Sequence, residues 1–141
     1  MQPTVLYLLA IMCSALAQAA MPLKDLKMLE LYKDVKRLNK SLQHDGSLSL
    51  NNPGTEIKEC CMASALQCYR SQLLLLKVSS TKLRYKVCKS LSSPLISEKL
   101  EGSSEDCQKN PQCQSCDLYP NTNSKEFMSK LTSLLEMANS N

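Results

Sequence analysis

The placement of the cysteines constrains this chain more than any other feature of its sequence. Cys61 and Cys68 lie seven residues apart in a stretch predicted to be helical, and Cys113 and Cys116 form a C-x-x-C pair ahead of a final amphipathic segment. Seven residues are almost two helical turns, so the first two thiols project from one face. Two thiols on a helix face and two on a loop can form two near-parallel bridges. A metal or redox site is the other interpretation of the C-x-x-C pair.

The N-terminus favours the disulfide interpretation, because it has the features of a secretory signal. Residues 5–17 (VLYLLAIMCSALA) are apolar and uncharged, with the length of a signal-peptide core and too few residues to span a bilayer. Small residues at 15, 17 and 19 offer cleavage sites after residues 17 to 20, although no Lys or Arg precedes the apolar run. We therefore predict a signal peptide over residues 1–19 and one secreted, extracellular domain over 20–141. A buried N-terminal helix is the alternative.

Secretion places the remaining cysteines in an oxidising environment, where disulfides persist. Removal of the signal takes Cys13 away and leaves an odd set, so one thiol stays free, pairs with another chain or is capped: Cys60, Cys61, Cys68, Cys88, Cys107, Cys113 and Cys116. The chain has no Trp and one Phe, and such an aliphatic core gains from covalent bridges. The net charge of +4 is too small and scattered to indicate nucleic-acid binding.

Hydrophobic periodicity predicts an all-α fold. A helix is expected over 22–43, with an apolar stripe at Met28, Leu31, Val35, Leu38 and Leu42. Thr55 to Lys77 and Ser80 to Leu91 are expected as two further helices, with a single kinked helix as the alternative. Residues 94–111 are predicted to be a long surface loop, and Asn123 or Ser124 to cap a last helix whose stripe contains Phe127, Leu131, Leu134 or Leu135, and Ala138. Four helices with a long late connection are typical of a helical bundle.

Neither catalysis nor metal binding is indicated. The one histidine, His44, lies at a predicted helix end, and no nucleophile and base stand at a motif spacing, so we expect no enzyme and no cofactor. Zinc bound by Cys61, Cys68, Cys113 and Cys116 is the rival to bridges, but the first pair lacks zinc-finger spacing, so no metal is expected. Asn39 begins an N-glycosylation sequon inside the first predicted helix, and both occupancy and disuse stay open.

Several motifs resemble those of one protein family. Residues 61–73 (CMASALQCYRSQL) fit the second-helix pattern C-x-x-[ST]-A-x-x-C-[FY]-x-x-x-L of the interleukin-2/15/21 cytokines. Residues 113–119 (CQSCDLY), followed by 125–127 (KEF) and 133–135 (SLL), resemble the approach to that family's last helix and the helix itself. The motif at residues 113–119, and residues 34–38 (DVKRL) in the first helix, are most similar to the interleukin-21 branch. The paired-cysteine motif is the specific part.

The resemblance implies a fold and a set of bridges. It implies a short-chain four-helix bundle with up-up-down-down topology, stapled by Cys61–Cys113 and Cys68–Cys116. Cys60 is adjacent to Cys61, and the seven-residue spacing to Cys68 favours Cys61 for the first bridge. A third pair, Cys88–Cys107, would close a loop across the serine-rich segment and leave Cys60 over.

The resemblance also implies a function. It implies a secreted, monomeric ligand that joins a private receptor to the common cytokine receptor gamma chain and so triggers Janus kinase/STAT signalling in lymphocytes. Private-receptor candidates on the first and third helices are Lys27, Glu30, Tyr32, Lys33, Lys36, Arg37, Lys82, Arg84 and Lys86. The resemblance places the gamma-chain face on the last helix and part of the first. There Glu136 stands where the family usually has Gln, and a carboxylate cannot donate as an amide does.

Two other functions are compatible with the same sequence. An interleukin-15-like or interleukin-2-like ligand would share the architecture and differ in its private receptor. A secreted cysteine-rich defence protein belongs to another class, and would show a large apolar cavity or a strongly amphipathic cationic surface. The basic cluster on the third predicted helix can also be an ordinary solvated face.

Overall fold

The computed structural model describes residues 21–43, 46–101 and 112–139. The predicted signal peptide, His44 and Cys107 lie outside these ranges. Within them the chain is mostly helical, which confirms the all-α prediction. No helix in the described ranges combines the length and the apolar character needed to cross a membrane.

The first described helix, α2 (Leu23–Lys40), follows the predicted stripe. Met28, Leu31, Val35 and Leu38 are completely buried, so the apolar face packs into the core as the 3.6-residue period requires. The helix ends three residues earlier than the predicted 43. At that end the Ser41 hydroxyl donates a 2.8 Å hydrogen bond to the Leu38 carbonyl.

The second expected helix is shorter than predicted. It was expected over Thr55 to Lys77, whereas α3 spans Met62–Leu73. Cys60 has φ of +68°, in the left-handed region, so the backbone turns sharply before the helix begins. The Glu101 carboxylate then accepts hydrogen bonds from the Cys60 amide and, at 3.1 Å, from the Met62 amide. The carboxylate of a distant residue therefore accepts hydrogen bonds from backbone amides at the start of α3. The sequence predicted Thr55 as the cap of this helix.

The break between the second and third helices is confirmed. Helix α4 spans Thr81–Leu91, and the Ser80 hydroxyl accepts a 3.2 Å hydrogen bond from the Leu83 amide. The connection before it is held to the end of α2, since the Gln43 amide donates to the Lys77 carbonyl at 2.8 Å. Two separate helices, and not one kinked helix, occupy this stretch.

The expected loop over 94–111 is wrong in its first half. Residues Pro94–Glu101 form a short helix, α5, with Pro94 at its first position, where a missing amide costs little. Ile96 is completely buried, and the Lys99 ammonium lies 2.9 Å from a carboxylate oxygen of Asp25 in α2. Burial and this ion pair favour helix in a segment whose Ser and charge content indicated loop. Residues 102–111 lie outside the described ranges.

The C-terminal part carries the last helix, α6 (Ser124–Asn139). The Asn123 side-chain oxygen accepts a 2.7 Å hydrogen bond from the Glu126 amide, which confirms the predicted cap. Before it come a single 3-10 turn, η2 (Cys116–Leu118), and β2 (Asn121–Thr122), which pairs antiparallel with β1 (Leu50–Asn51). The predicted stripe of α6 is buried: Phe127, Leu131, Leu134, Leu135 and Ala138.

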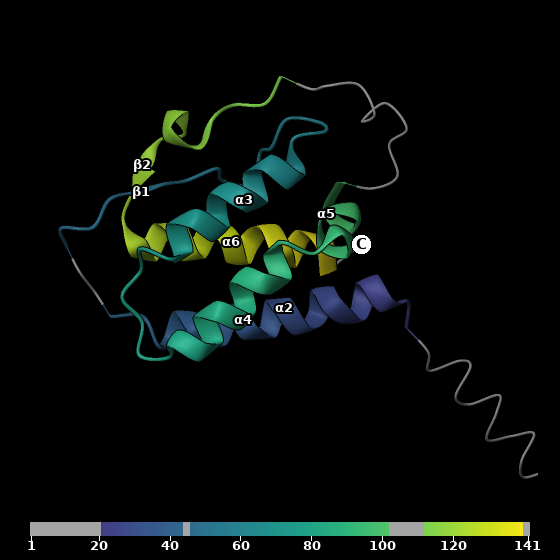
Figure 1. Ribbon diagram of the computed structural model, residues 1–141, viewed down its shortest axis with the longest axis horizontal. Coiled ribbons are helices and arrows are strands. Elements are labelled where there is room, and N and C mark those ends of the chain that lie inside the picture. The colour runs from purple at the N-terminus through teal and green to yellow at the C-terminus, as the bar shows by residue number, and fades with distance from the viewer. Residues whose placement is uncertain (1–20, 44–45, 102–111, 140–141) are drawn as a thin grey trace, which may run out of the picture.

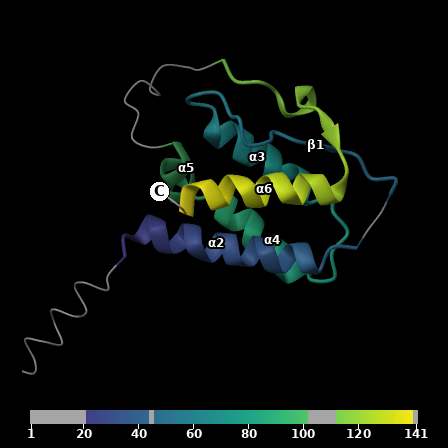
Figure 2. The same cartoon turned by 180° about the vertical axis from the view of Figure 1, so that it is seen from behind.

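The helices enclose one aliphatic core. Helices α2 and α6 lie side by side, and α4 packs against both α2 and α3 (Figure 1). Followed by colour, α2 and α3 run in one general direction while α4 and α6 run in the other, in the front and rear views alike (Figures 1 and 2). At the centre the rings of Tyr69 and Phe127 lie 5.2 Å apart.

Candidate functional site

Two disulfides join α3 to the segment that precedes α6. Cys61–Cys113 and Cys68–Cys116 have Cα–Cα distances of 5.5 and 5.2 Å, within the usual range for a bridge. Both predicted pairings are confirmed, as is the choice of Cys61 over its neighbour. Because these four sulfurs are consumed in bridges, the zinc interpretation is wrong. Among the described residues no cluster of three or more potential metal ligands occurs.

The third predicted pair, Cys88–Cys107, is wrong. Cys88 is a buried, free thiol in α4, so it does not bridge to Cys107. Cys60, expected to be left over, is disulfide-bonded. Cys88 is turned toward α3, where its thiol lies 3.8 Å from the Arg70 carbonyl. Cys88 stays a free thiol because its side chain packs toward α3, and this direction cannot be predicted from the cysteine spacing.

A charged surface spans α2 and α4. The Lys86 ammonium of α4 lies 2.9 Å from a Glu30 oxygen and 3.2 Å from an Asp34 oxygen, and Arg37 reaches Asp34 at 2.7 Å. The Asp34 side chain is 2% exposed, so this carboxylate is held at the seam of the two helices. Hydrogen bonding to Glu30, and then to Asp34, raises the pKa of Lys86. We call these four residues the α2–α4 ion cluster.

Asp34 was missed as a member of this cluster. It is four residues after Glu30 and three before Arg37, so the three share one helix face. Helical spacing alone offered this signal. The burial of Asp34 depends on α4 lying across it, and that contact is visible only in the folded chain.

Other candidates flank the α2–α4 ion cluster. Arg37, Lys82 and Lys86 line a surface hollow of about 540 Å³. Lys27 and Lys33 are exposed on α2. The structure therefore brings Arg37 of α2 and Lys82 and Lys86 of α4 to one hollow, next to the paired acids.

Arg84 does not belong to that side. Its guanidinium donates a 2.7 Å hydrogen bond to the Leu76 carbonyl and lines a different hollow, between α3 and α4. The family resemblance grouped it with Lys82 and Lys86, which alternate with it along the sequence. On a helix, alternate residues point about 200° apart, so the grouping fails for geometric reasons.

The remaining candidates gather at the seam of α2 and α6. The Tyr32 hydroxyl donates a 3.2 Å hydrogen bond to Glu136, and the Lys36 ammonium lies 5.2 Å from the centre of the Tyr32 ring. Asn39, the sequon residue, is exposed in the last turn of α2. The hydroxyl of Ser41, the third residue of the sequon, is bonded to the Leu38 carbonyl.

No protein-family model matches the chain, and a search of curated proteins returned no significant match.

Proposed function

We propose that this protein is a secreted cytokine of the interleukin-2/15/21 type, closest to the interleukin-21 branch. It would bind a private class I cytokine receptor chain and the common gamma chain, and so trigger Janus kinase/STAT signalling in lymphocytes and other immune cells. The observation that carries the proposal is the pair of bridges from α3 to the segment before α6. They join the two motifs on which the family resemblance rests.

The helix directions support the same proposal. Helices α2 and α3 run one way and α4 and α6 the other, which supports assigning these four helices to an up-up-down-down bundle. In this assignment α5 is an additional short helix within the connection between α4 and α6. The disulfides also suit an extracellular ligand, because such bonds persist in oxidising compartments.

The surfaces divide between two receptor chains. The α2–α4 ion cluster with Lys33 and Lys82 would meet the private receptor, where exposed cations would steer an acidic partner into place. The Tyr32–Glu136 seam would meet the gamma chain, since it joins the first and last helices. Arg84 is left out of both surfaces because its guanidinium is bonded to the α3–α4 connection.

Surface-plasmon binding to three separate ectodomains from the same species tests the proposal: the interleukin-21 receptor, the interleukin-15 receptor alpha chain and the common gamma chain. Binding to the first of the two private chains is expected. Binding to the alpha chain would instead indicate an interleukin-15-like ligand. A folded, helical sample that binds none of the three would contradict the cytokine proposal.

Charge-reversal variants locate the private-receptor surface. Lys33→Glu with Lys82→Glu is expected to slow association about tenfold, with a smaller effect at high salt, because exposed charges act mainly on the association rate. Lys24→Glu with Lys125→Glu is the matched control, since both lysines are exposed and the net charge changes equally. Equal association rates for the two variants would remove the α2–α4 surface from the interface.

A further inference from the structure

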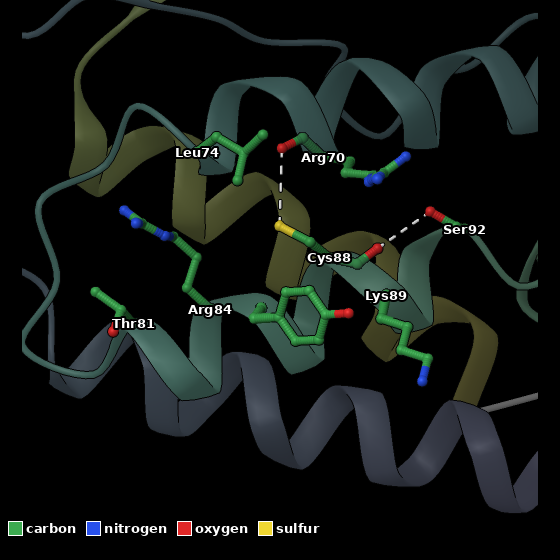
Figure 3. A pocket seen from close by; sticks show the side chains of 8 residues that line it. Arg70, Leu74, Thr81, Arg84, Cys88, Lys89 and Ser92 are labelled. Atoms are coloured by element: carbon green, nitrogen blue, oxygen red, sulfur yellow. Dashed lines mark hydrogen bonds between the residues drawn. The ribbon is translucent and has the colours of Figure 1, made fainter.

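A groove between α3 and α4 shares only Tyr85 and Lys89 with the hollow beside the α2–α4 ion cluster. It has a volume of about 630 Å³, and Figure 3 shows Cys88 at its floor, with Arg70 contributed by α3, Leu74 by the residue that follows α3, and Arg84 and Lys89 by α4. The Cys88 thiol faces the Arg70 carbonyl across the groove. Since α4 also packs against α2, the groove and the α2–α4 ion cluster lie along two sides of the same helix.

Large apolar side chains remain exposed at this groove. Leu74 is 56% exposed and Tyr85, which also lines it, is 70% exposed. Next to Leu74, Leu75 is 53% exposed. Covering such side chains would be favourable by about 25 cal/mol for each Å² of apolar surface removed from water. A ligand with an apolar group of its own therefore fits the walls.

The charge at the groove has one sign. Between Glu59 and Glu98 the sequence has no Asp or Glu, so neither α3 nor α4 contributes a carboxylate. Arg70, Arg84 and Lys89 line the groove, whereas Lys86 of the same helix points to Glu30 and Asp34 of α2. Lys86 is thus balanced within the chain, and the cations along the groove meet no acid from its two helices.

We propose that the groove docks a segment of a partner protein in which carboxylates flank one large apolar side chain. The apolar side chain would lie over Cys88 between Leu74 and Tyr85, while the carboxylates would pair with Arg70 and Lys89. A sulfated polysaccharide shares the negative charge but has no apolar side chain to cover the two walls. The combination of exposed apolar walls and cations favours an acidic protein segment.

The thiol at the floor provides a direct readout of occupancy. Alkylation of Cys88 by iodoacetamide, located by mass mapping, is followed with three synthetic peptides of equal length. The first carries Glu around Leu and Trp, the second has Lys in place of Glu, and the third has Ser in place of Leu and Trp. With the first peptide at about ten times its Kd, alkylation should slow about tenfold, because mainly unoccupied protein reacts. The second and third peptides should protect little.

Two variants with equal charge changes locate the effect. Arg70→Glu with Lys89→Glu should weaken binding of the first peptide at least tenfold, and Lys24→Glu with Lys125→Glu should leave it within twofold. Leu74→Ser, at an exposed position, tests the apolar wall and serves if the first variant fails to fold. It should also weaken binding severalfold.

Clear results would overturn the proposal. They are an unchanged alkylation rate with the first peptide, equal protection by the lysine peptide, or equal losses in the groove and control variants. Stronger protection by a heparin oligosaccharide than by the acidic, apolar peptide would also overturn it, because the occupant would then be a polysaccharide. None of these readouts depends on receptor binding, so the groove and the cytokine proposal are tested separately.

Discussion

The Tyr32 hydroxyl of α2 donates a hydrogen bond of 3.2 Å to Glu136 of α6. The contact joins helices that are far apart in the sequence, and Lys36 lies over the same tyrosine ring at 5.2 Å. Glu136 accepts the hydrogen bond of the hydroxyl, but a carboxylate has no hydrogen to offer a receptor. The seam therefore presents acceptors where an amide would also present a donor.

Replacing this acid by an amide should strengthen gamma-chain binding. Glu136→Gln keeps an acceptor for Tyr32 and adds a donor, and one added hydrogen bond of about 0.5–1.5 kcal/mol corresponds to about 2- to 10-fold in Kd. Surface-plasmon titration of the gamma-chain ectodomain measures the change. Glu126→Gln, at an exposed acid on the same helix, should leave the Kd unchanged. An identical Kd for Glu136→Gln and the parent would contradict the role of the seam.

Loss of the Lys86 cation should destabilise the protein through Asp34. Lys86→Met leaves the buried Asp34 carboxylate with Arg37 as its nearest cation among the residues of the cluster, so the melting temperature should fall. Lys89→Met, an exposed lysine on the same helix, should have little effect. Combining Lys86→Met with Asp34→Asn should cost less than the sum of the two single changes, because each already removes the same ion pair.

This contribution of Lys86 should depend on pH in a defined direction. Hydrogen bonds to Glu30 and Asp34 raise the pKa of Lys86 in the folded protein, so folding favours its protonated form. The stabilisation is complete below the pKa of an unfolded lysine, about 10.4, and is lost as pH rises through the higher folded value. Urea unfolding of the parent and Lys86→Met should differ equally at pH 6 and 9, and the difference should shrink above about pH 10.5. A difference that grows at high pH would contradict the assignment.

Removal of one bridge should cost about 2–5 kcal/mol of unfolding free energy, the usual value for a native disulfide in a small secreted domain. Cys68→Ser with Cys116→Ser and Cys61→Ser with Cys113→Ser should have similar effects, because the pairs are separated by 48 and 52 residues. Denaturant unfolding of both variants measures this. An unfolding midpoint equal to that of the parent would mean that the bridge adds nothing to stability.

The Tyr69 hydroxyl should contribute about 1–2 kcal/mol to the free energy of unfolding, since it donates a 2.8 Å hydrogen bond to the Gly54 carbonyl. The change Tyr69→Phe removes this donor from the carbonyl. Burial raises the pKa of Tyr69, so the hydroxyl ionises more readily in the unfolded chain. Stability from this group is therefore present below about pH 10 and lost above it. Tyr69→Phe should show a smaller alkaline loss than the parent, whereas Tyr85→Phe, at an exposed ring, should follow the parent.

Local patterns predicted much of the architecture. The stripes of α2 and α6, the start of a helix at Ser80 and the cap Asn123 agree with the sequence predictions, because they depend on a 3.6-residue period and on contacts within three residues. The two bridges were expected once the spacing of Cys61 and Cys68 was combined with the family resemblance. Composition also indicated an aliphatic core with few aromatic side chains, which gains from covalent bridges.

Long-range contacts decided the remainder. Helix α3 begins at Met62, where the Glu101 carboxylate accepts the hydrogen bond of the Met62 amide, and α5 forms in a polar segment because Ile96 has a place in the core. Cys88 stays a thiol, and Arg84 leaves the α2–α4 surface, because α4 packs with these two side chains toward α3. The sequence by itself determined the helical stripes, the caps and the cysteine spacing. Only the tertiary structure decided which distant groups meet, since that depends on how whole helices pack and not on spacing along the chain.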